Sequence, residues 1–202
     1  NYTCAKENQV IIKPPFISME QAAAIPQAGT ISLQALREKQ NLKGRKVLMN
    51  GGGGAVGSFA IQLAKFYGAE VTAVDTGSKS DFMKSLGADH VIDYKKDNFT
   101  KNGLKYDLIV DVVANQGIYD YKRALSKKGS YVLIGGKIPT ALQVGLMGLM
   151  ISRKHGKKIG ILGSKTNQGL SDIINLIESG NLKVVIDKSF PLEKTAEAIR
   201  YL

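Results

Sequence analysis

The chain has 202 residues, and its 44% hydrophobic and 22% charged residues describe a folded globular protein rather than a disordered or fibrous one. Its single cysteine, Cys4, excludes a disulfide framework within the chain, and we expect a reducing, cytoplasmic compartment. The net charge of +11 raises the question of a nucleic-acid partner, but the basic residues are scattered and no basic run reaches five, so none is expected.

The first forty residues predict a short strand followed by two helices. Residues 9–12 are apolar enough for a strand, which the following Pro-Pro pair ends. Ser18 and Gln21 have the spacing of a capping box, in which each side chain accepts a hydrogen bond from the main chain of the other residue. The helix that they open is expected to stop at Pro26, and a second helix is expected over residues 30–40.

The stretch from Lys46 to Asp75 carries the main functional signal. An apolar run leads into four glycines, then a helical pattern and a second apolar run follow, so we expect strand, glycine turn, helix and strand. Gly52, Gly54 and Gly57 fit the dinucleotide fingerprint, in which they serve a tight turn, a close pyrophosphate and close helix packing in that order. Amides at the helix start suit a diphosphate, and the predicted binding residues are Gly52, Gly53, Gly54, Ala55, Val56 and Gly57.

The acid that ends the second apolar run bears on the choice of cofactor. Asp75 lies 18 residues after Gly57, near the roughly 20 expected of the acid that binds an adenosine ribose, which favours NAD. Thr76, Ser78 and Lys79 follow at once, and hydroxyls with a lysine are what a loop holding a 2′-phosphate would use, which favours NADP. Both cofactors stay open, and dual use with Asp75 as the discriminator is the hypothesis.

After this stretch, strand and helix patterns continue to alternate. Strands are expected over 90–93, 106–113, 130–134 and 159–162, and helices over 82–86, 119–125 and 170–178. This alternation indicates a parallel sheet covered on both faces, so the predicted fold is a doubly wound α/β Rossmann fold. The apolar stretch 139–151 is shorter than the about 20 residues that cross a membrane, and no membrane partner is expected.

Five blocks of the sequence, in their order and spacing, resemble the medium-chain dehydrogenase/reductases, and most of all their zinc-independent quinone oxidoreductase branch. The blocks are EQAAAIPQAGTISLQAL (20–36), VLMNGGGGAVGSFAIQLAKFYGAEVTAVD (47–75), SLGADHVIDY (85–94), KYDLIVDVV (105–113) and GSYVLIGG (129–136). The resemblance covers nearly the whole chain. It implies an NAD(P)H-dependent oxidoreductase that transfers a hydride to a quinone, an enone or another carbonyl compound.

The resemblance also implies how the chain is divided. Family members begin with a GroES-like catalytic domain, so residues 1–17 are expected to be the end of such a domain, truncated here, and residues 18–202 the dinucleotide-binding domain. Residues that contact the substrate would then lie mostly in the catalytic domain. No catalytic residue is therefore assigned in this chain, and the chain alone is expected to turn over no substrate.

Further site residues follow from the resemblance alone. Gly135 and Gly136 match the position whose backbone passes near the nicotinamide, and Ala114 and Asn115 are similar candidates. Zinc-dependent relatives carry a zinc ligand in the stretch that matches residues 22–30, which here contains no Cys, His, Asp or Glu. Chemistry without zinc, and no metal ligand, is therefore expected.

Relatives of this kind often pair through an edge strand of the cofactor domain. Residues 158–162 are the candidate edge here, and a homodimer is expected because a flat apolar edge invites pairing. A second function stays open, namely a sensor or scaffold that binds the dinucleotide without turnover, because a fold does not by itself imply activity.

Overall fold

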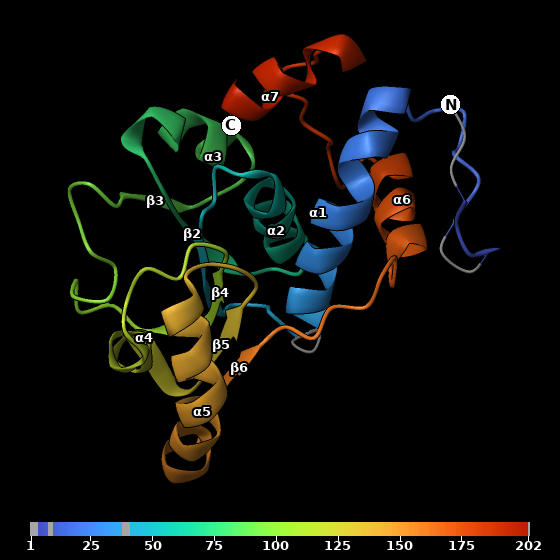
Figure 1. The fold of residues 1–202 in the computed structure, drawn as a ribbon. Helices are drawn as coiled ribbons and strands as arrows, with labels where there is room; N and C mark the ends of the chain where they lie inside the picture. The colour runs from blue at the N-terminus through green and yellow to red at the C-terminus, as the bar shows by residue number, and fades with distance from the viewer. Residues whose placement is uncertain (1–3, 8–9, 38–40, 202) are drawn as a thin grey trace.

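The computed structural model describes residues 4–7, 10–37 and 41–201, and one six-stranded sheet forms its centre (Figure 1). The strands are β1 (Lys46–Asn50), β2 (Glu70–Asp75), β3 (His90–Asp93), β4 (Tyr106–Asp111), β5 (Leu125–Leu133) and β6 (Lys158–Ile161). Every adjacent pair is parallel. Their order, β3-β2-β1-β4-β5-β6, is that of the Rossmann fold, with its reversal between β1 and β4, so the predicted fold class is confirmed.

Helices cover both faces of the sheet (Figure 1). One face shares a core with α1 (Met19–Arg37), α2 (Ala55–Phe66), α3 (Ser80–Ser85) and α6 (Leu170–Glu178), and the other with α4 (Ile118–Ala124) and α5 (Ile138–His155). Along β1, Val47 and Met49 belong to the first core and Leu48 to the second, because successive strand side chains point to opposite faces. Three short elements complete the described chain: η2 (Gly77–Lys79), η3 (Leu192–Lys194) and α7 (Thr195–Tyr201).

One helix, α1, stands where two helices are predicted. The predicted capping box is present: the Ser18 N–H donates to Gln21 Oε1 at 3.0 Å, and the Gln21 N–H donates to Ser18 Oγ at 3.2 Å. The helix continues through Pro26, although an internal proline costs about 3 kcal/mol. Its packing against α2 and α6 outweighs that cost, through the buried side chains of Ile25, Ala28, Leu33, Ala35 and Leu36. The predicted helix end, at residues 38–40, lies outside the described residues.

One further prediction needs correction, and one helix was not predicted. Val10 to Ile12 form no strand, and Ile12 is 93% exposed, because no strand of the described chain pairs with this segment; Gln9 lies outside the described residues. The stretch 139–151, to which the sequence patterns assign no element, lies within α5. Its proline falls in the first helical turn, where the missing N–H removes no hydrogen bond. The other predicted strands and helices over residues 82–178 are present: β3 and α6 have the predicted bounds, and the rest have shifted ends.

Candidate cofactor site

The glycine turn joins β1 to α2 at the carboxyl edge of the sheet. Gly51 has a φ of +90°, a left-handed conformation that favours glycine, and its N–H donates to Val74 O at 2.9 Å. The Gly52 N–H donates to the same oxygen at 3.0 Å. The tight turn that the sequence assigns to Gly52 is therefore made by Gly51, a residue that the prediction misses. Gly52 serves close packing instead, because an added Cβ would lie 2.9 Å from Ala73 Cβ.

Gly57 brings α2 against this turn. An added Cβ on Gly57 would lie 2.3 Å from the Gly51 carbonyl oxygen and 2.6 Å from Gly52 Cα, both of which belong to the main chain. This is the close approach of helix and strand that the fingerprint assigns to its third glycine. Gly54 differs, because an added Cβ would meet only Gly51 O, at 3.6 Å. The space beside Gly54 is therefore open.

The first turn of α2 presents main-chain N–H groups toward the edge of the sheet. Gly54 is its N-cap residue, and no side chain of the described residues caps these groups. Ala55, Val56 and Gly57 form the first turn, where helix geometry leaves N–H groups without a partner inside the helix. Together with the positive end of the helix dipole, these amides suit an anion. Ser32 of α1 holds the turn in place, since its Oγ donates to Val56 O at 2.8 Å.

Asp75 ends β2 and faces the glycine turn. Its Oδ2 accepts the Gly53 N–H at 2.9 Å, and its Oδ1 accepts the Thr76 N–H at 2.8 Å. Lys79 Nζ lies 3.8 Å from the same Oδ1, and Lys79 Cδ lies 2.4 Å from where a Cβ on Gly53 would be. The hydroxyls of Thr76 and Ser78 are 3.0 Å apart. The predicted acid and its polar neighbours are thus brought together beside the turn, with the carboxylate bonded to two amides.

The loops after β4 and β5 meet at the same edge. Ala114 is buried with a φ of +46°, and Asn115 beside it is exposed. Gly136 has a φ of +129°, and an added Cβ would lie 2.3 Å from Ala114 Cβ; one on Gly135 would lie 3.3 Å from Val112 O. These two glycines let the loops pack tightly. All the predicted site residues therefore lie at the carboxyl ends of strands, around the point where the strand order reverses.

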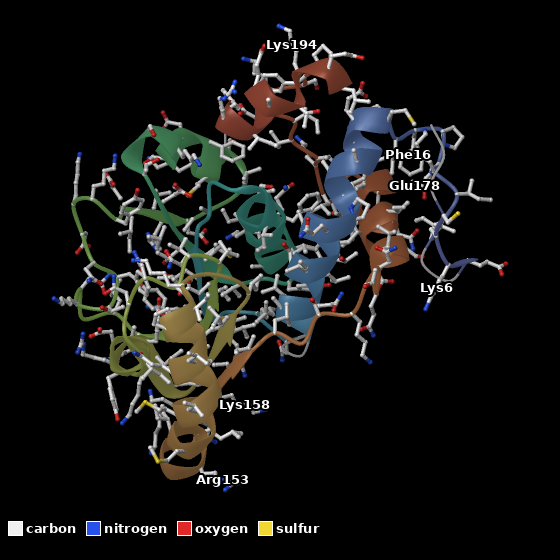
Figure 2. All side chains as sticks on the ribbon, in the orientation of Figure 1. Lys6, Phe16, Arg153, Lys158, Glu178 and Lys194 are labelled. Atoms are coloured by element: carbon white, nitrogen blue, oxygen red, sulfur yellow. The ribbon has the colours of Figure 1, made fainter. Side chains whose placement is uncertain are left out.

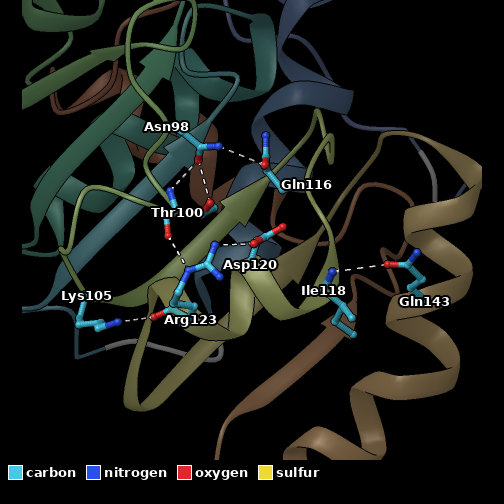
Figure 3. A network of polar contacts seen from close by, with 8 residues as sticks. All are labelled: Asn98, Thr100, Lys105, Gln116, Ile118, Asp120, Arg123 and Gln143. Atoms are coloured by element: carbon cyan, nitrogen blue, oxygen red, sulfur yellow. Dashed lines mark hydrogen bonds and ion pairs between the residues drawn. The ribbon is translucent and has the colours of Figure 1, made fainter.

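The loop before β4 is tied to the loop after it by the polar contacts that Figure 3 shows. Asn98 Nδ2 donates to Gln116 Oε1 at 3.3 Å, and Asn98 Oδ1 accepts both the N–H and the hydroxyl of Thr100. Arg123 Nε of α4 donates to Thr100 O at 3.1 Å. The loop that carries Ala114 is therefore held by α4 and by the loop that follows β3.

A small opening of about 50 Å³ lies between these loops. It is lined by Asn50, Val74, Tyr94, Asp97, Asn98, Phe99, Asn115 and Gln116. The sequence patterns do not single out Tyr94, whose N–H donates to Asp75 O at 3.2 Å; its only signal is its position just after a strand. A larger hollow of about 490 Å³ lies between α1 and β6, and none of the glycines of the turn lines it. The loops, rather than this hollow, carry the features of a nucleotide site.

Within the described ranges, no three His, Cys, Asp or Glu residues lie together in a way that could hold a metal ion. His90 Nε2 lies 3.1 Å from Glu70 Oε1, as an exposed pair at the starts of β3 and β2. Of the helices among the described residues, none is long and apolar enough to cross a membrane.

Comparison with known families decides the membership of the chain. The profile of the zinc-binding dehydrogenase family matches residues 86–202, which is more than half of the chain. The chain belongs to the zinc-binding dehydrogenase family. The predicted place among the medium-chain dehydrogenase/reductases, in a quinone oxidoreductase-like branch, is confirmed by the relatives that follow.

The relatives that match this chain are longer than the chain itself. It is 32% identical over 209 residues to a chloroplastic quinone-oxidoreductase homolog of Spinacia oleracea, which covers 98% of the chain and 62% of that protein. It is 32% identical over 207 residues to a chloroplastic NADPH-dependent alkenal/one oxidoreductase of Arabidopsis thaliana, and this match covers 100% of the chain and 48% of that protein. The solved structure of the quinone oxidoreductase from Coxiella burnetii matches with a TM-score of 0.80 and 28% identity, over 95% of the chain and 59% of that structure. The chain thus spans less than two thirds of these relatives.

The two glycines of the turn should respond differently to the same substitution. Gly57→Ala should lower the free energy of unfolding by about 1–3 kcal/mol or more, because the new Cβ overlaps the main chain of Gly51 and Gly52. Gly54→Ala is the matched control and should change it little, because its Cβ enters open space. Urea unfolding followed by circular dichroism measures both values. Equal stability of the two variants would contradict the packing role of Gly57.

Proposed function

We propose that this dehydrogenase chain binds NADPH or NADH and serves an oxidoreductase that transfers a hydride to a quinone, an enone or another carbonyl compound. The observation that carries the proposal is the convergence of the α2 amides, the Asp75 carboxylate and the loops after β4 and β5 on one edge of a Rossmann sheet. The names of the relatives support the oxidoreductase class and the use of NADPH.

Each part of the edge receives a part of the cofactor in this proposal. The diphosphate lies on the amides of Ala55 and Val56, where Gly54 leaves room for it. The adenosine ribose lies at Asp75, with Thr76, Ser78 and Lys79 next to it. The nicotinamide half lies along the loops of Ala114, Asn115, Gly135 and Gly136. The proposed order follows the strand ends from β2 across β1 to β4 and β5.

The chemistry of the proposed reaction comes from the bound nicotinamide, which supplies the hydride. The residues of this chain bind and orient the cofactor, and none is assigned as a catalytic acid or base. We propose that no zinc takes part, because residues 22–30, where zinc-dependent relatives carry a ligand, hold none of the usual ligand residues. Three expectations stay predictions: that residues 1–17 are the end of a catalytic domain, that the chain alone turns over no substrate, and that the protein is cytoplasmic.

The alternative is a sensor or scaffold that binds the dinucleotide without turning it over. Oxidation of NADPH in the presence of a quinone or an enone, followed by absorbance at the nicotinamide band, separates the two functions. The assay requires the whole protein, because the chain spans only 62% of the spinach relative. Turnover supports the oxidoreductase, and binding without turnover supports the sensor.

Gly54→Val should abolish binding of NADPH and NADH while the fold persists. The added side chain occupies the space proposed for the diphosphate, and its Cβ meets only Gly51 O, at 3.6 Å. Isothermal titration calorimetry measures affinity, and circular dichroism measures the fold. Affinity equal to that of the wild type would contradict the placement of the diphosphate.

Asp75→Ser should tighten NADPH relative to NADH by about tenfold or more, an effect of roughly 1.4 kcal/mol. The acid favours ribose hydroxyls and repels a 2′-phosphate, whereas loss of its bond to Gly53 affects both cofactors alike, so the ratio is measured. Asp107→Ser makes the same charge change at the opposite end of the strands and should leave the ratio unchanged. If calorimetric titration finds the same ratio for Asp75→Ser as for the wild type, Asp75 is not at the ribose.

We propose in addition that two chains pair through β6. This strand is at an edge of the sheet, as predicted, and Ile161 on it is 52% exposed. The neighbouring α5 exposes an apolar row made of Ile138, Leu142, Leu146, Leu149 and Met150. Figure 2 shows Arg153 at the end of α5 and Lys158 at the start of β6 at the same end of the molecule. Pairing of two β6 strands would satisfy the open edge and cover the apolar row.

Light scattering at high micromolar concentration should therefore give the mass of a dimer. Leu146→Glu should shift the chain toward the monomer, because it places a charge within the apolar row. Ile199→Glu, on the distant helix α7, is the matched control and should leave the dimer intact. A monomer of the unaltered chain would count against the proposal.

A further inference from the structure

Asp111 ends β4 at the point where the strand order reverses, and its side chain is fully buried, with 0% exposed. Its Oδ1 accepts three hydrogen bonds: from Asn50 Nδ2 at 2.8 Å, from the Val113 N–H at 2.9 Å and from the Ala114 N–H at 2.8 Å. One oxygen thus joins the end of β1 to the turn that follows β4. The proposed function uses this turn, but it gives no role to the carboxylate that holds it.

The second oxygen of Asp111 is bonded from the other side. Tyr131 OH of β5 donates to Oδ2 at 3.1 Å, and the ring of Tyr121 packs against that of Tyr131 with centroids 4.3 Å apart and planes inclined by 32°. Burial raises the pKa of both phenols, and the negative charge of Asp111 raises it further, so both hydroxyls stay protonated. Tyr121 OH in turn accepts the Gln116 N–H at 3.1 Å. The turn is thereby fixed at Val113, Ala114 and Gln116.

The conformation of this turn requires such support. Ala114 has a φ of +46°, a left-handed conformation that side-chain-bearing residues seldom adopt, and its methyl group is buried against Gly136. A residue keeps a strained backbone conformation only where the surrounding structure fixes that conformation, and such residues are frequent at ligand sites. The two N–H bonds to Asp111 Oδ1 span the strained residue and hold it in place.

We propose that Asp111 is a positioning residue for the cofactor: with Asn50 it locks the turn over residues 112–115 in the shape that receives the nicotinamide half. This inference rests on the proposed function. Hydrogen bonds to a charged acceptor are about twice as strong as neutral ones, which is the advantage of a carboxylate here over an amide. Asn50 lies directly across from Asp111 in the β1–β4 ladder, so the lock bridges the two strands at the reversal of the sheet.

Asp111→Asn is the first test, because it keeps the shape of the side chain and removes the charge. The affinity of the chain for NADPH, measured by calorimetry, should fall about tenfold or more. Asp107→Asn is the matched control, since Asp107 lies at the other end of β4 and bonds to the same neighbouring strands through Lys46 N and Ser126 Oγ. That control should bind NADPH as the wild type does. Melting temperatures show whether each variant is folded at the assay temperature.

Asn50→Asp is the second test, and its readout is a pH profile. It places two carboxyl groups at hydrogen-bond distance in a buried site, where they share one proton at low pH and the second ionises only as the pH rises. Affinity for NADPH should then fall as the pH rises from 5 to 8, because ionisation of the second carboxylate drives the strands' ends apart. The titratable groups that face the pair are Tyr121 and Tyr131, with Tyr94 and Asp97 at the opening above Asn50. The reversed pair, Asn50→Asp with Asp111→Asn, has one carboxylate and should lose this pH dependence.

The outcomes separate the inference from the proposed function. If the wild type binds neither NADPH nor NADH, the proposed function fails. If the wild type binds but folded Asp111→Asn binds equally well, or if the affinity of Asn50→Asp varies with pH as that of the wild type does, the positioning role is wrong. A merely structural carboxylate would change melting temperatures and leave the affinity of the folded chain and its pH profile unchanged. Should Asp111→Asn fail to fold, the Asn50→Asp profile and its reversal still decide the question.

Discussion

The close approach of α2 to the end of β1 is the constraint on which the rest of the site depends. Gly57 allows it, because any side chain there would overlap Gly51 and Gly52. The approach fixes where the first turn of α2 lies, and with it the direction of the amides at Ala55 and Val56. It also keeps Gly53 within hydrogen-bond distance of Asp75, so that turn, helix and second strand form one rigid unit.

The other half of the site, formed by the loops after β4 and β5, is held by buried hydrogen bonds instead of close main-chain packing. Asn50 and Asp111 are 61 residues apart in the chain, yet their side chains meet at 2.8 Å because β1 and β4 are neighbours. A buried polar group without its partner is costly, so such a network is stable only when every member is satisfied. The loops after β4 and β5 therefore hold one arrangement, in which Gly136 fits against Ala114.

The opposing signals for cofactor choice also meet in space. Asp75 favours an unmodified ribose and Lys79 favours a 2′-phosphate, but the fold places Lys79 Nζ 3.8 Å from Asp75 Oδ1. The lysine offsets part of the charge with which the acid would repel a phosphate. Both carboxylate oxygens of Asp75 in turn accept hydrogen bonds from main-chain amides, those of Gly53 and Thr76. In the proposed function, cofactor preference therefore depends on the balance within this group rather than on either residue alone.

The sequence by itself determined the fold class and the neighbourhood of the site. Strand patterns that alternate with helical patterns indicated a parallel sheet, because parallel strands need a crossover connection, which is usually a helix. The spacing of Gly54, Gly57 and Asp75 marked the edge at which the strands end. The capping box at Ser18 was equally local, since its two bonds join residues three apart.

Only the tertiary structure decided the features that depend on partners distant in sequence. α1 runs through Pro26 because packing on α2 and α6 outweighs a local penalty, and Val10 to Ile12 form no strand because a strand requires a neighbour. The tight turn is at Gly51 rather than at Gly52, because the N–H groups of both glycines donate to Val74 O of β2 and so direct the main chain as it leaves β1. Asp111 reads in sequence as an interruption of an apolar strand. Three N–H groups and one O–H group donate hydrogen bonds to Asp111, and they come from β1, from β5 and from the turn after β4. No local sequence pattern predicts that these groups lie together.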